Sequence, residues 1–279
     1  MTEPGAPSPE DEQTLTGGVS TVVRIGDTLH RSTGPWTPAV HALLRHLARV
    51  GFDGAPRVLG HDAQGREILS FVDGDIAPGP TPGAYPEETL FALGRLIRRM
   101  HAATKGFSLP EGVQWHHPPV TDLPGQLGGP LVVCHNDLSP GNTVLDPGGH
   151  PIALIDWGLA SPAPPVWDLV QAAWQFIPLA PDAACADHGW PAPPDRLGRL
   201  RTMLDGYGRR NFSDAARRHF AQLVALRIER TASGIERLAA QGEPAFIRFV
   251  DLGAVASVRA DGVWVTAHAD AVNAALLPE

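Results

Sequence analysis

The sequence predicts an α+β fold in two lobes, with a small N-terminal lobe built on a β-sheet and a larger C-terminal lobe made mainly of helices. Over residues 15–72, short apolar runs separated by Gly and Asp are typical of strands joined by tight turns. From residue 166 onward, apolar residues recur three and four positions apart, as in amphipathic helices. A Pro- and Gly-rich stretch at 75–86 separates the two patterns. We therefore place the small lobe at 13–74 and the large lobe at 75–279.

Composition limits the classes of function that the chain can have. It has 279 residues, enough for a substantial core, and a formal net charge of −8. Binding to a nucleic-acid backbone requires clustered cations, so this acidic balance argues against a nucleic-acid partner. No uninterrupted apolar run reaches the roughly 18 residues that a membrane-spanning helix needs. We therefore expect neither nucleic acid nor a membrane among the partners.

The N-terminus and the cysteine content predict a cytoplasmic location. Residues 1–12 are polar and Pro-rich and lack the basic and apolar regions of a signal peptide, so we expect a disordered tail. Cys134 and Cys185 are too few for a disulfide framework, which suits a reducing compartment. Nothing in the sequence predicts the oligomeric state.

The small lobe is predicted to contain a hairpin, a helix and two further strands. The hairpin spans residues 15–31 and turns at Gly26-Asp27. The helix covers 38–50, with Pro38 at its first position and Gly51 after its last turn. Strands at 56–61 and 67–72 follow, joined by a polar turn.

The large lobe is predicted to hold a long helix, a short central β-structure and a helical remainder. The helix covers 87–104, and a buried strand at 131–134 leads to a hairpin of strands at 143–145 and 152–155. The further helices are expected at 166–176, 196–208, 213–241, 244–259 and 265–277.

Two short motifs carry the side chains best suited to catalysis. The first is HNDLSPGN at 135–142, and the second is IDWG at 155–158. A hairpin lies between Asn142 and Asp156, and a hairpin brings its two ends together. An amide oxygen and a carboxylate at one point suit Mg²⁺, which prefers oxygen ligands. Asp137 lies across a tight Pro-Gly turn from Asn142 and faces the same point. That position suits a base that orients a hydroxyl for attack on a phosphoryl group.

These two motifs resemble those of the aminoglycoside phosphotransferase and choline kinase group, which is related to the protein kinases. In that family, H-x-D-x-x-x-x-N forms the catalytic loop and D-x-G opens the metal-binding segment. The resemblance extends over most of the chain, because the order of predicted elements also matches. It implies a protein-kinase-like fold with a nucleotide-binding N-terminal lobe and a catalytic C-terminal lobe. One small subgroup with a similar sequence character is that of the trifolitoxin immunity proteins.

The resemblance also implies roles for five residues. Asp137 would be the catalytic base, and Asn142 and Asp156 would be the Mg²⁺ ligands. His135 and Asp168 would brace the catalytic loop without touching substrate. The implied cofactors are ATP or GTP together with Mg²⁺. The implied acceptor is a small hydroxylated molecule such as an antibiotic or an amino-alcohol.

The implied nucleotide site lies in the small lobe and at its junction with the large lobe. Gly17, Gly18 and Ser20 form a glycine-containing turn that is expected near the phosphates, although the full G-x-G-x-x-G pattern is absent. Backbone groups of Ser70, Phe71 and Val72 are expected to hold the nucleotide base. Arg31 is expected to bind the α- and β-phosphates.

Arg31 is also where the sequence departs from the family pattern, which has lysine at this position and a glutamate in the next helix. The predicted helix at 38–50 contains no Asp or Glu, so no ion-pair partner is evident there. Arginine binds phosphate well, although its reach and geometry differ from those of lysine. Two hypotheses follow: an active small-molecule phosphotransferase, or a weak or inactive kinase-fold protein that acts by binding, as an immunity protein does.

Two further groups carry weaker signals. His116 and His117 resemble a metal pair, but adjacent residues of an extended chain point to opposite sides, so a polar loop is expected. Asp182, Asp187, Asp195 and Asp205 lie where the family places its substrate-binding segment. Either an acidic pocket for an amine or a solvated helical surface fits these four residues.

Overall fold

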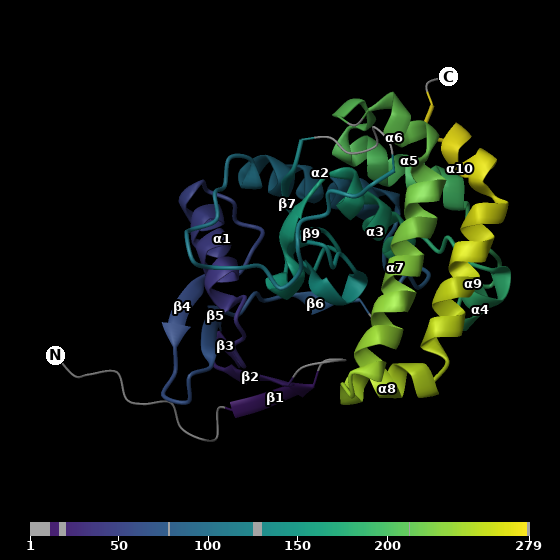
Figure 1. Ribbon diagram of the computed structural model, residues 1–279. Coiled ribbons are helices and arrows are strands. Elements are labelled where there is room, and N and C mark those ends of the chain that lie inside the picture. The colour runs from purple at the N-terminus through teal and green to yellow at the C-terminus, as the bar shows by residue number, and fades with distance from the viewer. Residues whose placement is uncertain (1–11, 17–20, 78, 125–129, 212, 278–279) are drawn as a thin grey trace.

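The small lobe is a five-stranded antiparallel sheet with one helix packed beside it (Figure 1). The computed structural model describes residues 12–16, 21–77, 79–124, 130–211 and 213–277. The sheet has the order β1-β2-β3-β5-β4. Its elements are β1 (Glu12–Thr16), β2 (Thr21–Ile25), β3 (Thr28–Arg31), β4 (Val58–His61), β5 (Glu67–Ser70) and the helix α1 (Thr37–Arg49).

The N-terminal boundary of the sheet differs from expectation by a few residues. Strand β1 begins at Glu12, which pairs with Ile25, whereas the sequence pattern placed residue 12 in the tail. The register between β1 and β2 explains this, because cross-strand pairing extends beyond the apolar run that made the strand visible. The remainder of the expected tail lies outside the described residues.

The large lobe combines two small sheets with a helical bundle (Figure 1). One sheet has the order β6-β8-β9, and the other pairs β7 with β10. Its strands are β6 (Asp75–Ile76), β7 (Val132–Cys134), β8 (Thr143–Leu145), β9 (Pro151–Leu154) and β10 (Ser161–Ala163). Its helices are α2 (Glu87–Thr104), α3 (Val166–Phe176), α4 (Asp182–Asp187), α5 (Arg196–Tyr207), α6 (Asp214–Arg218), α7 (Phe220–Ala240), α8 (Pro244–Asp251), α9 (Ala254–Ala267) and α10 (Ala269–Ala274).

The C-terminal helices are more broken than the sequence pattern predicted. The expected helix at 213–241 is two helices, α6 and α7, which meet at His219. The expected helix at 244–259 ends at Asp251, because Gly253 adopts a left-handed conformation with φ of 76° before α9 begins. Apolar periodicity continues across both breaks, so it could not reveal them. The prediction of one final helix from residue 265 was also wrong, since α9 runs to Ala267.

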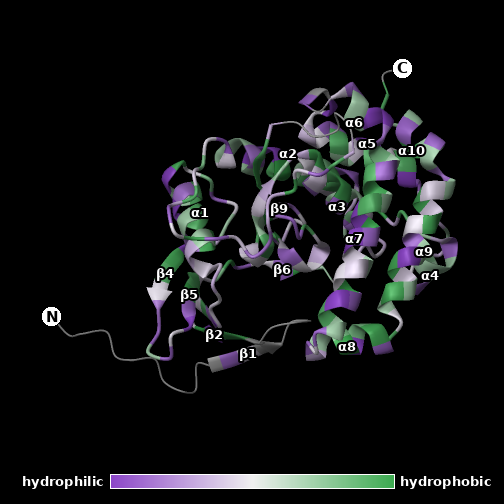
Figure 2. Cartoon of the chain, viewed as in Figure 1, coloured by the Kyte–Doolittle hydropathy of each residue, from purple (hydrophilic) through white to green (hydrophobic). Residues whose placement is uncertain are grey.

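The core of the large lobe forms around α2, α3 and α7. Helix α3 is buried along nearly its whole length, and Figure 2 shows hydrophobic residues gathered in α2 and α3. Burying this much apolar side-chain surface is the main favourable contribution to folding. The strands that carry the catalytic loop rest on this core, because Val133 and Cys134 of β7 and Leu154 of β9 are all buried.

Helices α2 and α5 are in direct backbone contact. A Cβ built on Gly94 would lie 2.0 Å from the carbonyl oxygen of Met203. A Cβ built on Gly206 would lie 2.0 Å from the carbonyl oxygen of Phe91. Both distances are far below a van der Waals contact, so only glycine fits at either position while the helices keep this separation.

We expect Gly94→Ala to lower the free energy of unfolding by about 1–3 kcal/mol, because the added methyl group forces the two backbones apart. Urea denaturation would measure this. Gly234→Ala is the matched control, because Gly234 lies inside α7 and a Cβ added there would meet nothing within 4 Å. That variant should gain about 0.5–1 kcal/mol from helix propensity. Equal effects of the two substitutions would contradict the close packing.

Candidate active site

The β8–β9 hairpin connects the predicted catalytic loop, residues 135–142, to the predicted metal segment, residues 155–158. Asn142 lies immediately before β8, and Asp156 follows β9 after one residue. The backbone N–H of Ile155 donates to the carbonyl oxygen of Asn142 at 2.9 Å, which joins the two ends. The structure therefore brings Asn142 and Asp156 to one region, as the hairpin pattern in the sequence required.

Asp137 and Asn142 are in direct contact across the Pro-Gly turn. The amide nitrogen of Asn142 donates to the Asp137 carboxylate and to the Asp137 carbonyl oxygen, each at 2.9 Å. This contact turns the amide oxygen of Asn142 away from Asp137. Burial raises the pKa of the Asp137 carboxyl, and the negative charge of Asp156 raises it further.

Asp156 occupies a left-handed backbone conformation, with φ of 59° and ψ of 69°. Such a conformation is uncommon for a residue other than glycine and is often found at functional sites. The Asp156 side chain is 48% exposed, so its carboxylate is open to solvent on one side. Its carboxylate and the amide oxygen of Asn142 are oxygen donors of the kind that Mg²⁺ prefers.

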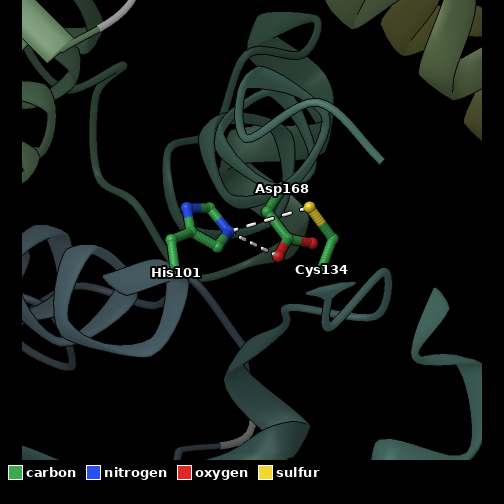
Figure 3. Close-up of side chains that lie close together, drawn as sticks. All are labelled: His101, Cys134 and Asp168. Carbon is green, nitrogen blue, oxygen red and sulfur yellow. Dashed lines mark hydrogen bonds and ion pairs between the residues drawn. The ribbon is translucent and has the colours of Figure 1, made fainter. Parts of the chain in front are cut away.

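Asp168 braces the catalytic loop from beneath. Its carboxylate is fully buried and accepts the backbone N–H groups of His135 and Asn136, each at 2.8 Å. It also bonds to the His101 ring at 3.0 Å, and the Cys134 thiol lies beside that ring (Figure 3). Burial alone would raise the pKa of Asp168. The bond to His101, the nearby His135 ring and the N–H of Asn136 together hold this pKa below its ordinary value.

The cluster of His101, Cys134 and Asp168 has the side-chain types and the spacing of a metal site. Its nitrogen, sulfur and oxygen atoms lie within 4.8 Å of one another. All three are buried, and burial raises the pKa of the Cys134 thiol well above its ordinary value, which disfavours the thiolate a metal needs. Both oxygens of Asp168 already accept hydrogen bonds. The cluster is therefore a structural support for the loop.

Two further side chains fix the loop. The His135 ring bonds to the carbonyl oxygen of Ile155 at 2.9 Å and so links the catalytic loop to the metal segment. Arg227 of α7 donates to the carbonyl oxygen of Asn136 and, at 2.7 Å, to the side chain of Gln171. Asn136 itself has φ of 63°, so it is the second left-handed residue of the site after Asp156. No sequence pattern pointed to Arg227, because the contact depends on how α7 packs.

Arg31 reaches the metal segment from the small lobe. Its NH1 donates to the Asp156 carboxylate at 2.7 Å, and its Nε donates to Glu67 at 2.5 Å. The expected absence of an acidic partner in the following helix is correct for α1, but a partner exists on strand β5. Glu67 was missed because its alignment with Arg31 depends on the β3–β5 register, in which these two residues are paired.

The segment expected to hold the nucleotide base already uses two of its backbone donors. The N–H of Ser70 donates to the carbonyl oxygen of Arg57 at 2.9 Å, and the N–H of Phe71 donates to the carbonyl oxygen of Asp27 at 2.8 Å. The Arg24 guanidinium lies 3.6 Å over the Phe71 ring. Of the three predicted residues, Val72 is thus the one whose backbone N–H makes no hydrogen bond within the described part of the chain. Gly17, Gly18 and Ser20 lie outside the described residues.

The two weaker groups of the sequence have plain structural explanations. His116 and His117 stack with their ring centroids 4.6 Å apart, and His116 stacks on Trp36 at 3.9 Å. The expected loop is present at these residues. The two rings nevertheless lie on the same side, because the backbone bends at 116–117 and is not extended there. Asp205 pairs with Arg209, and Asp187 is exposed at the end of α4, as expected of a solvated helical surface. Asp182, which pairs with Arg196, and Asp195, which caps α5, both line a cavity of about 600 Å³. The four carboxylates therefore divide between a solvated surface and a cavity.

Among the described residues, no helix is both long enough and apolar enough to cross a membrane.

Residues 113–197 match the model of the phosphotransferase enzyme family, and this range includes the catalytic loop and the metal segment. The trifolitoxin immunity protein of Rhizobium leguminosarum bv. trifolii is 40% identical over 203 residues, which cover 71% of this chain and 74% of that protein.

Solved structures show the same fold. Amicoumacin kinase, in complex with AMP-PNP, Ca²⁺ and Ami, matches with a TM-score of 0.62 and 14% identity over 82% of each chain. Spectinomycin phosphotransferase, in complex with ADP and spectinomycin, matches with a TM-score of 0.55 and 13% identity over 91% of this chain and 93% of that one. The predicted kinase-like fold is thereby confirmed, and the chain belongs to the phosphotransferase enzyme family.

Proposed function

We propose that this protein transfers the γ-phosphate of ATP or GTP to a hydroxyl of a small molecule, with Mg²⁺ as the cofactor. The observation that carries the proposal is the grouping of Asp137, Asn142 and Asp156 at the two ends of one hairpin. A base and two oxygen ligands are among the parts that recur in enzymes of phosphoryl transfer. When bound, Mg²⁺ neutralises the charge of the β- and γ-phosphates.

Each residue has one task in this proposal. Asp156 and Asn142 hold the metal, and Asp137 accepts the hydrogen bond of the acceptor hydroxyl and orients it toward the phosphate. Burial raises the pKa of the Asp137 carboxyl, which is the direction that favours a proton acceptor. Arg31 supplies positive charge to the α- and β-phosphates, and His135 and Asp168 keep the loop in place.

The structural neighbours support a nucleotide and a small-molecule acceptor. Two of them were solved with AMP-PNP or ADP, and their names describe kinases of amicoumacin and spectinomycin. We therefore propose an antibiotic or amino-alcohol acceptor for this chain. A cytoplasmic location is part of the same proposal, since that compartment supplies the nucleotide.

A second candidate is a binding or immunity protein on the kinase fold. The specific observation in its favour is that the 40% identical relative is named an immunity protein. Arg31 in place of lysine also suits this candidate, because its guanidinium is tied to Asp156 in the structure. Such a protein would bind its partner without steady turnover of nucleotide.

Thermal denaturation with ATP or GTP, with and without Mg²⁺, tests the metal site. At a hundredfold excess over its dissociation constant, a ligand of the folded state adds about 2.7 kcal/mol of stability. We expect a Mg²⁺-dependent rise in Tm for the wild type and none for Asp156→Ala, which removes the exposed metal-binding carboxylate. Asp205→Ala, which removes an exposed carboxylate on α5, should keep the rise. A rise retained in Asp156→Ala would contradict the assigned role.

A further inference from the structure

A chain of four polar side chains crosses the small lobe and ends at the metal segment. His41 of α1 bonds through Nε2 to one oxygen of Glu67 at 2.7 Å. The other oxygen of Glu67 accepts from Nε of Arg31 at 2.5 Å, and NH1 of Arg31 donates to Asp156 at 2.7 Å. The chain joins α1, β5, β3 and the segment after β9, which are far apart in the sequence.

Both oxygens of Glu67 are held, and this fixes the direction of the Arg31 side chain. Glu67 is 2% exposed and His41 is 3% exposed, so water competes little for these bonds. Because Nε of Arg31 is anchored to Glu67, the guanidinium is held at one end, and NH1 at its other end donates to Asp156. The nucleotide phosphates would lie beside Asp156 in the proposed function.

We propose that Glu67, fixed by His41, is the positioning residue that aims Arg31 at the nucleotide phosphates. It does so from strand β5, in a chain whose helix α1 carries no acidic residue. NH1 of Arg31 bonds to Asp156 in the present structure. It would turn to a phosphate oxygen once a cation occupied the Asp156 carboxylate. This inference rests on the proposed nucleotide site.

The charge states of the pair agree with this geometry. Burial alone would raise the pKa of Glu67, but the bonds from His41 and Arg31 keep it below its ordinary value. Glu67 is therefore ionised at neutral pH. A buried carboxylate is costly unless it is paired, and an apolar residue often serves stability equally well. Stability alone therefore does not explain a buried carboxylate at Glu67. A role in positioning the Arg31 guanidinium does.

The same sheet contains a matched control. His30, Asp62 and Arg66 form another histidine–carboxylate–arginine set, with distances of 2.9 Å from His30 to Asp62 and 2.6 Å from Arg66 to Asp62. The other bonds of Asp62 are to backbone N–H groups of its own turn, and none of these contacts leads to Asp156. Asp62→Asn therefore perturbs a similar network in the same lobe without acting on Arg31.

The test measures the affinity of the full-length chain for a fluorescent ATP analogue, and for its GTP counterpart, with Mg²⁺ and without acceptor. We expect Glu67→Gln and Arg31→Gln each to weaken binding about tenfold. The double variant should be no weaker than the weaker single variant, because Glu67 acts through Arg31. Asp62→Asn should bind within about twofold of the wild type. His41→Gln, which keeps a donor, should bind better than His41→Leu.

The outcomes separate this inference from the proposed function. Additive losses in the double variant, or an equal loss in Asp62→Asn, would overturn the positioning role, because either shows a general effect on the lobe. A wild type that binds nucleotide but transfers no phosphate to any acceptor would overturn the proposed function and leave the positioning role standing. A wild type that binds neither nucleotide would overturn both. Circular dichroism melts on every variant establish that the protein measured is folded.

Discussion

Asp137→Asn should lower kcat about 10²- to 10⁴-fold, which is the usual contribution of a positioned general base. The substitution is nearly isosteric, and the new amide oxygen can still accept the hydrogen bond that Asn142 donates to Asp137. The geometry of the metal ligands should therefore survive, and the dissociation constant for Mg²⁺–nucleotide should change by less than about twofold. Coupled-enzyme detection of ADP or GDP with a panel of hydroxylated acceptors measures kcat, and titration of the nucleotide measures binding.

Asp146→Asn is the control for this experiment. Asp146 lies in the turn of the β8–β9 hairpin and accepts the N–H of His150 at 2.9 Å, which an asparagine oxygen can also do. Its activity should equal that of the wild type. If Asp137→Asn retained full kcat, Asp137 would not be the base. If it lost nucleotide affinity in step with kcat, its role would lie in holding the metal.

Asp168→Ala should lower the free energy of unfolding by about 3–5 kcal/mol, the usual loss when one partner of a buried ionic network is removed. The N–H groups of His135 and Asn136 and the His101 ring would all lose their buried acceptor. A buried donor left without a partner costs about 1–3 kcal/mol. Denaturation in urea at pH 7 measures the change, and activity should fall with it because the loop loses its support.

The pH dependence of that loss has a definite sign. The folded-state pKa of Asp168 lies below its ordinary value of 3.8, so its carboxylate stabilises the fold at pH values above about 4. This contribution is lost as the pH falls through the folded-state pKa. The part of the difference between wild type and Asp168→Ala that comes from this carboxylate should therefore shrink as the pH falls below about 4. A difference that grew toward acid pH would contradict the assignment of an ionised brace. Asp168→Asn keeps one acceptor oxygen, so its free energy of unfolding should lie between those of the wild type and Asp168→Ala.

The sequence predicted correctly that Asn142 and Asp156 would come together, because this geometry is local. Asn142 and Asp156 converge through one hairpin, and a hairpin is visible as two apolar runs around a turn. Helices α2 and α3 have the bounds expected from periodicity, because each begins and ends at a clear change of pattern. Arg31 could be located for the same reason, since it ends a strand of the first hairpin.

Features that depend on packing could not be predicted in this way. The contact between Arg31 and Glu67 requires the register of two strands that are separated by α1 and β4. The anchoring of Asn136 by Arg227 requires the placement of α7, which lies far along the chain from the catalytic loop. Glu67 and Arg227 resemble surface charges when only neighbouring residues are considered. Tertiary contacts decide which of the many polar residues become part of the site.

The backbone contact between α2 and α5 constrains how this sequence can diverge. The atoms that a side chain at Gly94 or Gly206 would strike are main-chain atoms of the opposite helix. Every residue type carries those atoms, so no substitution on the opposite helix can create the missing space. Evolutionary drift in the side chains around this crossing is therefore free to proceed, while the two glycines can change only if the helices first separate. Homologues with the same helix spacing should keep both glycines, and homologues without them should show a wider crossing.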